Sequence, residues 1–317
     1  MKVSLQINLA PSDYRHTKYL LPHQLDILQH QVDEILLIID TSPSQGRFAT
    51  GWHENKANLY DFLTKDILSA YPVKIIPVDY GYDQQKQIGK FFFGHNRVPK
   101  KDFRGGPFYA YFFGLFKAQH PLVFHLDSDM FLGGGSQSWI KEAVELYQNN
   151  PDVLTISPLP GPPHPEEKLV GQHDYQRIGH YQFEFKGMST RIFLIDKDRL
   201  AKHKLQLAKP PFKSQLKAII EGNTNADLPE HLISNFMQEQ KLKRIDFLGE
   251  GKGLWSLHPP FRNPQFYELL PSLIKAVEEN KLPVAQNGFY DVIDEVCDWE
   301  YNRQLLKNNR WWQRLLG

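Results

Sequence analysis

The segment that decides the fold is LVFHLDSDMFL, residues 122–132. It begins with an apolar run interrupted only by His125, and then carries two aspartates, Asp127 and Asp129, with one residue between them. A short apolar run of this kind predicts a strand buried on both faces, with the aspartates in the loop at its carboxyl end. Two carboxylates so spaced can turn toward one hard cation, and we therefore expect them to bind Mg²⁺ or Mn²⁺.

The same spacing occurs a second time, at Asp196 and Asp198, again after an apolar run. Here Lys197, Arg199 and Leu200 surround the acids and indicate the first turn of a helix. An acidic residue at that position caps the helix and is stabilised by its dipole. We therefore interpret the second copy as a helix cap and only the first as a metal site.

Outward from residues 122–132, apolar runs alternate with helical patterns along most of the chain. Residues 3–9 alternate between apolar and polar residues and predict a half-buried strand; apolar runs predict strands at 35–39, 73–78, 153–156 and 191–195. The expected helices include 21–32, 59–70, 108–118 and 228–240. This alternation predicts an α/β protein with a mostly parallel sheet flanked by helices. Residues 158–188 contain five prolines and no clear period, so we interpret them as a long loop that forms a lid or the acceptor surface.

Composition excludes several classes of protein. The 317 residues carry 37 Lys and Arg against 36 Asp and Glu, a net charge of +1 that provides no general field for nucleic acid. The single cysteine, Cys297, cannot form an internal disulfide, which favours a reducing compartment. We expect a cytoplasmic protein without a signal peptide or membrane span. We divide it into a catalytic domain at 1–260 and a helical C-terminal extension at 261–317.

Two more predicted strands also end in an acid, Asp40 after residues 35–39 and Asp79 after residues 73–78. Aspartate is a common turn residue, so either acid alone could be structural. The carboxyl ends of parallel strands meet at one edge of a sheet, however, where ligands bind. Together with Asp127 and Asp129, they predict a ligand site at this edge.

In this order of strands and acids the sequence resembles glycosyltransferases of the GT-A fold, most closely those of the family-2 type. The resemblance covers about residues 1–260. It implies that Asp127-Ser-Asp129 is the DxD motif, which holds a divalent cation against the diphosphate of a nucleotide sugar. It implies nucleotide contacts from Pro11 and Asp13, and contacts of Asp40 and Asp79 with the base and ribose.

Three later segments add to the resemblance. Arg104, followed by two glycines, resembles the segment that leads into the metal-binding strand, and its guanidinium would suit phosphate oxygens. Glu230, near the start of a predicted helix, resembles the catalytic base of inverting members, with Asp227 as the nearest rival. His258 resembles a histidine that completes the metal shell or touches the diphosphate; a hydrogen-bonded structural histidine is the alternative.

The resemblance implies a metal-dependent, hexosyltransferase-like enzyme. It would move a sugar, with inversion, from a UDP-sugar, or alternatively a GDP-sugar, to a hydroxyl of a glycan, lipid or small-molecule acceptor. Two other functions stay open. A GT-A-like domain could bind the nucleotide sugar without turnover, or the chain could be a sugar-phosphate nucleotidyltransferase. The last needs a glycine-rich loop after the first strand, and LAPSDY at residues 9–14 has no glycine.

The C-terminus ends in a predicted helix with two tryptophans, Trp311 and Trp312, beside Arg310 and Arg314. We expect this helix to pack on its own domain. A peripheral membrane contact or a dimer contact through the same helix is the alternative.

Overall fold

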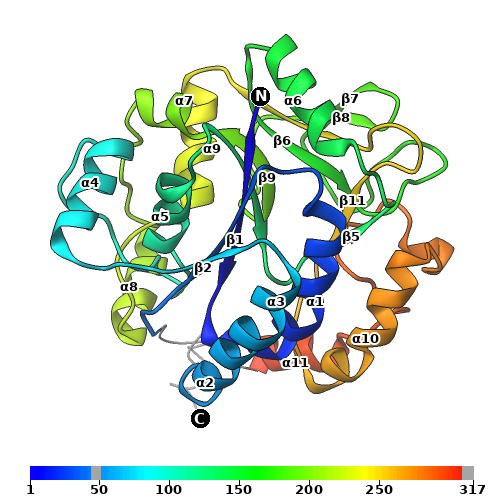
Figure 1. Cartoon of the computed structure of the whole chain (residues 1–317), viewed down its shortest axis with the longest axis horizontal. Helices are drawn as coiled ribbons and strands as arrows, with labels where there is room; N and C mark the ends of the chain where they lie inside the picture. Colours follow the sequence, from blue (N-terminus) through cyan, green and yellow to red (C-terminus); the bar gives the residue numbers. More distant parts are fainter. Residues whose placement is uncertain (44–50, 309–317) are drawn as a thin grey trace.

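The computed structural model describes residues 1–43 and 51–308, and Figure 1 shows its central sheet with helices around it. The strands follow the order β3-β2-β1-β4-β9-β6-β10-β8-β7, and a short pair, β5 and β11, continues from β6. The strands are β1 (Val3–Leu9), β2 (Glu34–Ile39), β3 (Lys74–Pro77), β4 (Leu122–Asp127), β5 (Phe131–Gly133), β6 (Val153–Pro160), β7 (Tyr175–Gly179), β8 (Gln182–Phe185), β9 (Ile192–Asp196), β10 (Lys243–Phe247) and β11 (Trp255–Leu257).

The helices alternate with these strands through most of the chain. They are α1 (Tyr14–Leu28), α2 (Trp52–Phe62), α3 (Leu68–Ala70), α4 (Tyr82–Phe92), α5 (Tyr109–Lys117), α6 (Trp139–Asn149), α7 (Lys197–Lys202), α8 (Phe212–Glu221), α9 (Pro229–Glu239), α10 (Pro264–Glu278) and α11 (Glu300–Asn308). Short 3₁₀ turns occupy Pro11–Asp13 and Val284–Gln286, and a π turn at Leu63–Ile67 joins α2 to α3. In the described part of the chain, no helix combines the length and apolar character needed to span a bilayer.

The predicted fold class is confirmed. β1, β2, β3 and β4 pair in parallel, and so do β6 and β10. β9 lies between β4 and β6 and runs antiparallel to both. β4, β6 and β10 therefore all end at the same edge of the sheet, which is where their loops meet.

Helices cover both faces of the sheet (Figure 1). One core contains Leu5 and Ile7 of β1 with the apolar faces of α1, α2 and α6. The other contains Leu36 and Ile38 of β2 with α4, α5, α7 and α9. Because β2 is buried on both sides, it is apolar from Ile35 to Ile39. In β1, Ser4 and Gln6 alternate with apolar residues, and both are buried as well.

A third core joins the C-terminal segment to the rest of the molecule. Phe266, Leu270 and Leu273 of α10 pack in it with Phe131 of β5 and Trp255 of β11. The division at residue 260 remains a prediction. Trp311 and Trp312, on which the predicted membrane or dimer contact depended, lie outside the described residues.

The prediction that residues 158–188 are a loop was wrong in part, because they contain the hairpin β7–β8. β7 is at the sheet edge and mostly exposed, so it has no apolar alternation, and β8 is only four residues long. Helices α4 and α8 were also not predicted. In α8, Phe212, Leu216, Ile219 and Ile220 are exposed, so its apolar residues do not mark a core-facing side.

Candidate active site

The two aspartates of the DxD motif lie beside the point where the sheet reverses its order. β1 has β2 on one side and β4 on the other, and ligands of open α/β sheets bind at such switch points. Asp127 is the last residue of β4, with a side chain 40% exposed, and Asp129 is 4% exposed. The aspartate pair is therefore at the carboxyl edge, as predicted, with one carboxylate open and one enclosed.

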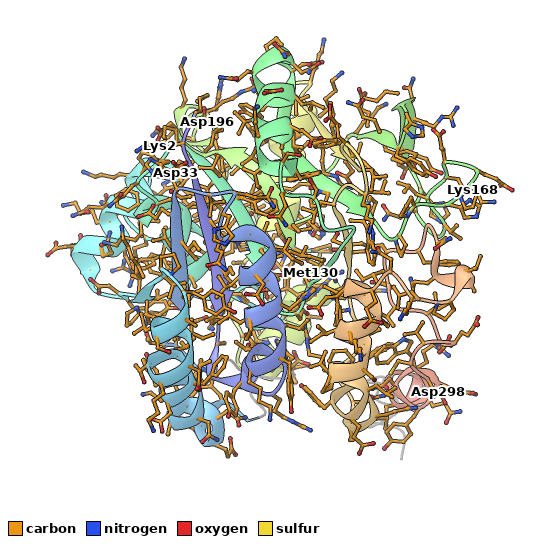
Figure 2. The ribbon with its side chains drawn as sticks, turned by 45° about the vertical axis from the view of Figure 1, so that its right-hand side comes forward. Lys2, Asp33, Met130, Lys168, Asp196 and Asp298 are labelled. Atoms are coloured by element: carbon orange, nitrogen blue, oxygen red, sulfur yellow. The ribbon has the colours of Figure 1, made fainter. Side chains whose placement is uncertain are left out.

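Helix α1 holds the loop that carries these aspartates. The Nε2 of Gln24 donates to the carbonyl oxygens of Asp127 at 3.1 Å and Met130 at 2.8 Å. Figure 2 labels Met130 near α1 in the middle of the molecule. His16, one turn into the same helix, lies with Nε2 3.2 Å from the Oγ of Ser128. Burial, followed by the positive charge of Arg262, lowers the pKa of His16 well below its usual range.

Asp129 contacts two basic side chains from the segment after β11. Arg262 forms an ion pair with its Oδ2 through Nη2, and the Nε2 of His258 is 3.9 Å from the same oxygen. The other ring nitrogen of His258, Nδ1, is 2.7 Å from Oδ1 of Asp291. A carboxylate partner requires the proton on Nδ1, so Nε2 of the neutral ring presents its lone pair toward Asp129.

The neutral state of His258 follows from its surroundings. Burial lowers its pKa, the hydrogen bond with Asp291 opposes this, and the charge of Arg191 lowers the pKa further. Its ring also stacks on Tyr290, with centroids 5.9 Å apart and planes 14° from parallel. A neutral imidazole held by a carboxylate is the usual form of a metal-binding histidine.

The carboxylates are accompanied by two arginines. The backbone carbonyl of Arg191 accepts from the N–H of Asp127 at 2.8 Å, and its guanidinium lies 5.9 Å from the ring centre of Tyr290. Arg262 also influences Asp13. Burial raises the pKa of Asp13 above its usual value; the charge of Arg262 opposes this increase, and the charge of Asp127 adds to it. The structure thus brings Asp13, Asp127 and the two guanidinium groups within electrostatic reach of one another.

Asp127, Asp129 and His258 are the candidate ligands of a metal ion. In the described ranges, no three His, Cys, Asp or Glu side chains are already arranged to hold one. The chemistry of the groups fits Mn²⁺, since two carboxylates and a neutral imidazole supply suitable donors. Arg262 occupies the carboxylate of Asp129, and it would have to leave that oxygen when a metal binds.

Glu230, the predicted base, is near the start of α9 and faces the same region. Its Oε2 accepts from the backbone N–H of Thr190 at 3.3 Å and from the hydroxyl of Thr190 at 3.4 Å. The next residue, Arg191, contacts Asp127 through its backbone. The buried Tyr111 lies within electrostatic reach of both Asp127 and Glu230. Burial, and then the charges of these two carboxylates, raise the pKa of its hydroxyl well above its usual range.

Asp227 is engaged differently. Its Oδ1 accepts from the backbone N–H of Leu228 at 2.8 Å and lies 2.8 Å from Nδ1 of His231. Asp227 is 7% exposed, and these contacts direct its carboxylate into the start of its own helix. Of the two acids, Glu230 has the more open carboxylate and the closer link to Asp127.

The predicted nucleotide contacts are distributed around this edge. Asp40 is buried and pairs with Nζ of Lys101 at 2.6 Å and the hydroxyl of Tyr80 at 2.6 Å. Asp79 is exposed and accepts from the N–H of Gly81 at 2.7 Å, closing a turn before α4. Both lie after their strands as expected, and their roles toward a base or ribose remain predictions.

The first loop and the basic segment also have defined positions. Pro11 is buried at the start of a 3₁₀ turn, which Asp13 closes by accepting from the N–H of Ala10 at 3.0 Å. Arg104 is exposed, and its guanidinium lies 5.1 Å from the ring centre of Phe103. A phosphate contact of Arg104 remains a prediction.

Sequence reasoning missed four residues that the fold brings to the aspartates: Arg191, Arg262, Tyr290 and Asp291. Arg191 had been placed only at the beginning of a strand. Arg262 follows His258 by four residues in a proline-rich segment, and that proximity was the one available signal. Tyr290 and Asp291 have no local pattern, because only the long-range bridge between His258 and Asp291 places them here.

No family model and no curated protein sequence matches the chain. Among solved structures, UDP-glucose pyrophosphorylase complexed with UDP-glucose matches with a TM-score of 0.44 and 10% identity over 87% of this chain and 99% of that chain. S. aureus TarS 1-349 in complex with UDP-GlcNAc matches at 0.40 and 12%, over 90% and 69%. Glucosyl-3-phosphoglycerate synthase from Mycobacterium tuberculosis, in complex with Mn²⁺, UDP and glucosyl-3-phosphoglycerate, matches at 0.38 and 9%, over 87% and 78%. These are weak likenesses of fold at low sequence identity, and they establish no family.

Proposed function

We propose that this chain is a metal-dependent glycosyltransferase that uses a nucleotide-diphosphate sugar, with UDP-sugar as the first candidate donor, and inverts the sugar. The observation that carries the proposal is the convergence of Asp127, Asp129, His258 and Glu230 at one edge of the sheet. This reaction needs carboxylates that bind a cation and a further carboxylate that accepts a proton from the acceptor hydroxyl.

Charge on the leaving diphosphate would be balanced by cations of this site. Arg191 and Arg262 offer guanidinium groups, whose planar forks match phosphate oxygens. Asp127, Asp129 and His258 would hold Mn²⁺ or Mg²⁺, which when bound supplies Lewis-acid stabilisation of the diphosphate. A diphosphate that enters would give Arg262 an alternative partner to Asp129 and so free that carboxylate.

Glu230 would act as the base. In the transfer, the acceptor oxygen forms a bond to the anomeric carbon while the bond from that carbon to the diphosphate breaks. The acceptor proton moves to the carboxylate of Glu230, and the nucleoside diphosphate leaves. Attack from the face opposite the diphosphate inverts the anomeric centre.

The first experiment tests the nucleotide and metal site by thermal denaturation with UDP and GDP, with and without Mn²⁺. We expect a Tm increase that requires both nucleotide and metal and disappears in Asp129→Ala. The matched control is Asp198→Ala, which changes an exposed aspartate in the second copy of the spacing. Loss of the response in both variants, or its absence from the wild type, would remove the support for the site.

The second experiment tests the base. Glu230→Gln should lower the rate of transfer, or of slow donor hydrolysis, by about 10²–10⁴-fold, because it cannot accept the proton. Nucleotide-dependent stabilisation should persist. Glu239→Gln, an exposed change at the other end of α9, is the control. Wild-type turnover in Glu230→Gln would place the base elsewhere, with Asp227→Asn the next variant to measure.

Two alternative functions make different predictions. A non-catalytic binding domain would show the nucleotide response without transfer or hydrolysis in the wild type. A nucleotidyltransferase would release pyrophosphate from a nucleoside triphosphate and a sugar phosphate. The turn at Pro11–Asp13, which has no glycine, offers no phosphate-cradling loop for that reaction.

A further inference from the structure

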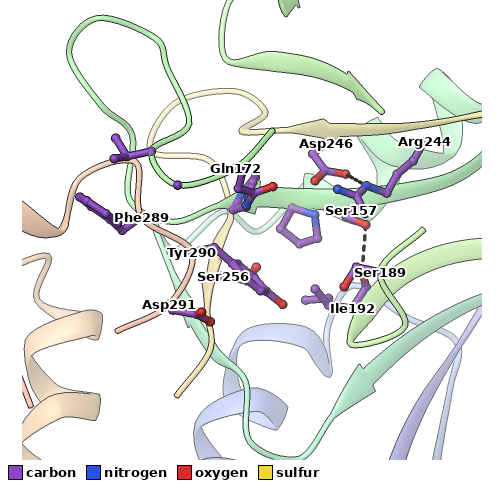
Figure 3. A pocket seen from close by; sticks show the side chains of 14 residues that line it. Ser157, Gln172, Ser189, Ile192, Arg244, Asp246, Ser256, Phe289, Tyr290 and Asp291 are labelled. Carbon is purple, nitrogen blue, oxygen red and sulfur yellow. Dashed lines mark hydrogen bonds and ion pairs between the residues drawn. The ribbon is translucent and has the colours of Figure 1, made fainter. Parts of the chain in front are cut away.

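A cavity lies next to the aspartate site at the same edge of the sheet (Figure 3). Its volume is about 300 Å³, at the lower end of the range for small-molecule sites. Residues of β6, β10 and β11 line it, together with residues 170–172 and 289–291. None of its lining residues belongs to the DxD motif, so the proposed nucleotide site does not account for it.

One wall of the cavity is a buried ion pair that no step described above uses. The Nε of Arg244 is 2.8 Å from Oδ1 of Asp246, and the two residues are 7% and 3% exposed. Figure 3 shows both side chains facing the cavity from β10. The guanidinium carbon of Arg244 lies 4.0 Å from the ring centre of Phe185. The Nε of this guanidinium has no hydrogen-bond partner of good geometry among the described residues, so a donor remains available on the wall.

Other polar groups of the lining are also unsatisfied. The Oγ of Ser256 is fully buried and has no hydrogen-bond partner among the described residues. The amide of Gln172 approaches from the facing loop (Figure 3). A buried hydroxyl without a partner is costly, and a ligand hydroxyl would satisfy it.

The charge of the wall indicates the class of ligand. Arg244 and Asp246 cancel each other, so the wall offers a donor and an acceptor side by side with no net charge. Such a pair matches adjacent hydroxyl groups, each of which both donates and accepts. A phosphate or carboxylate ligand would instead face the carboxylate of Asp246 at close range.

The cavity is connected to both halves of the candidate active site. Tyr290 and Asp291 line the cavity. The ring of Tyr290 also stacks on that of His258, and the carboxylate of Asp291 forms a hydrogen bond with His258. Ser189 lines it as well, and the next residue, Thr190, contacts the carboxylate of Glu230. A ligand in the cavity therefore lies between the segment that positions the base and the segment that positions the metal-site histidine.

We propose that this cavity is the acceptor site, and that it binds a neutral, polyhydroxylated unit of monosaccharide size through Arg244, Asp246, Gln172 and Ser256. This inference rests on the proposed glycosyltransferase function. The ligand exposes one hydroxyl toward Glu230 and the others toward the ion pair.

The test is saturation-transfer NMR on the full chain with glucose, galactose, mannose and N-acetylglucosamine, each with UDP and Mg²⁺. At least one sugar should show saturation transfer, and its dissociation constant should rise about tenfold or more in Gln172→Ala and in Ser256→Ala. These variants avoid breaking the buried ion pair. Gln176→Ala, an exposed glutamine on the neighbouring strand β7, is the control and should leave the constant unchanged.

The outcomes separate this inference from the proposed function. If UDP binds but none of the four sugars does, or if both cavity variants bind sugar as the wild type does, the acceptor site is overturned while the nucleotide site stands. Preferential binding of glucose 6-phosphate over glucose overturns the neutral class. If a sugar binds in the cavity but no nucleotide stabilises the protein, the proposed glycosyltransferase fails and only sugar binding remains.

Discussion

At the scale of single residues, the decisive contact is the one between Arg262 and Asp129. A carboxylate that is 4% exposed needs a cation, and Arg262 supplies it. The same carboxylate is one of the two that the sequence predicts to bind a metal. Arg262 and the proposed metal ion would therefore compete for Asp129.

This competition predicts the behaviour of Arg262→Gln. Without metal, the variant should have a lower Tm than the wild type, because Asp129 loses its counter-charge. Mn²⁺ alone should bind about tenfold more tightly, since a charge-assisted contact of about 1.5–3 kcal/mol no longer has to be broken. Titration calorimetry with MnCl₂ measures this. Arg177→Gln, an exposed arginine of β7, is the control, and Mn²⁺ affinity equal to or below that of the wild type would contradict the competition.

The second copy of the spacing, Asp196 and Asp198, is a helix cap, as its neighbouring residues predicted. The Oδ1 of Asp196 accepts from the backbone N–H groups of Asp198 at 2.9 Å and Arg199 at 3.1 Å. It caps α7, as predicted from the basic residues that follow it. Both copies follow a buried strand, so only the adjacent sequence distinguished this cap from the copy that is predicted to bind a metal.

At the scale of elements, α1 positions the aspartate loop. Gln24 is fully buried and connects this helix to two carbonyls of the loop, on either side of Asp129. Helix α10 then packs against α1 and β5. The loop is thus held between two helices that are more than 200 residues apart in sequence.

Gln24→Leu should loosen this arrangement. The change leaves two carbonyl oxygens without their donor, and each buried unsatisfied group costs about 1–3 kcal/mol. We expect the free energy of unfolding to fall by about that amount or more, measured in urea, together with weaker Mn²⁺-dependent nucleotide binding. Gln238→Leu, at an exposed position of α9, is the control. Unchanged nucleotide binding in a destabilised Gln24→Leu would limit the role of α1 to stability.

At the scale of the whole molecule, the sheet brings the buried ion pair of Arg244 and Asp246 and the two aspartates Asp127 and Asp129 to one edge. Asp246 is 3% exposed, and burial raises its pKa to about 6, while Arg244 opposes the increase. Because its pKa is raised, the folded protein binds the proton of this carboxyl more tightly than the unfolded chain does, and protonation stabilises the folded state. It therefore contributes stability at low pH that is lost as the pH rises through about 4 to 6.

Asp246→Asn isolates this contribution, because asparagine does not titrate and the other groups are common to both proteins. The difference in unfolding free energy, wild type minus variant, should decrease by up to about 3 kcal/mol as the pH rises from about 4 to about 7. Urea denaturation of both proteins at several pH values measures it. A difference that stays constant across this range would show that Asp246 keeps an ordinary pKa.

Much of the fold followed from sequence periodicity. The strands at residues 35–39 and 122–126 were predictable because a strand covered on both faces is apolar at nearly every position. The strand at residues 3–9 was predictable because apolar and polar residues alternate in it. The β7–β8 hairpin was not, because an exposed edge strand has no such pattern. The antiparallel direction of β9 was also not predictable, because its sequence, IFLI, is as apolar as that of its parallel neighbours.

The sequence by itself determined the sheet class, the order of the strands along the chain and the acids at their ends. Those properties depend on residues close together in sequence. Only the tertiary structure decided which side chains meet those acids: Arg262 on Asp129, Asp291 on His258, and Arg191 beside Asp127. It also decided that a cavity with an ion pair at its wall adjoins them. These contacts join segments separated by tens to more than a hundred residues, and their positions depend on how strands pair and helices pack, which no local pattern encodes.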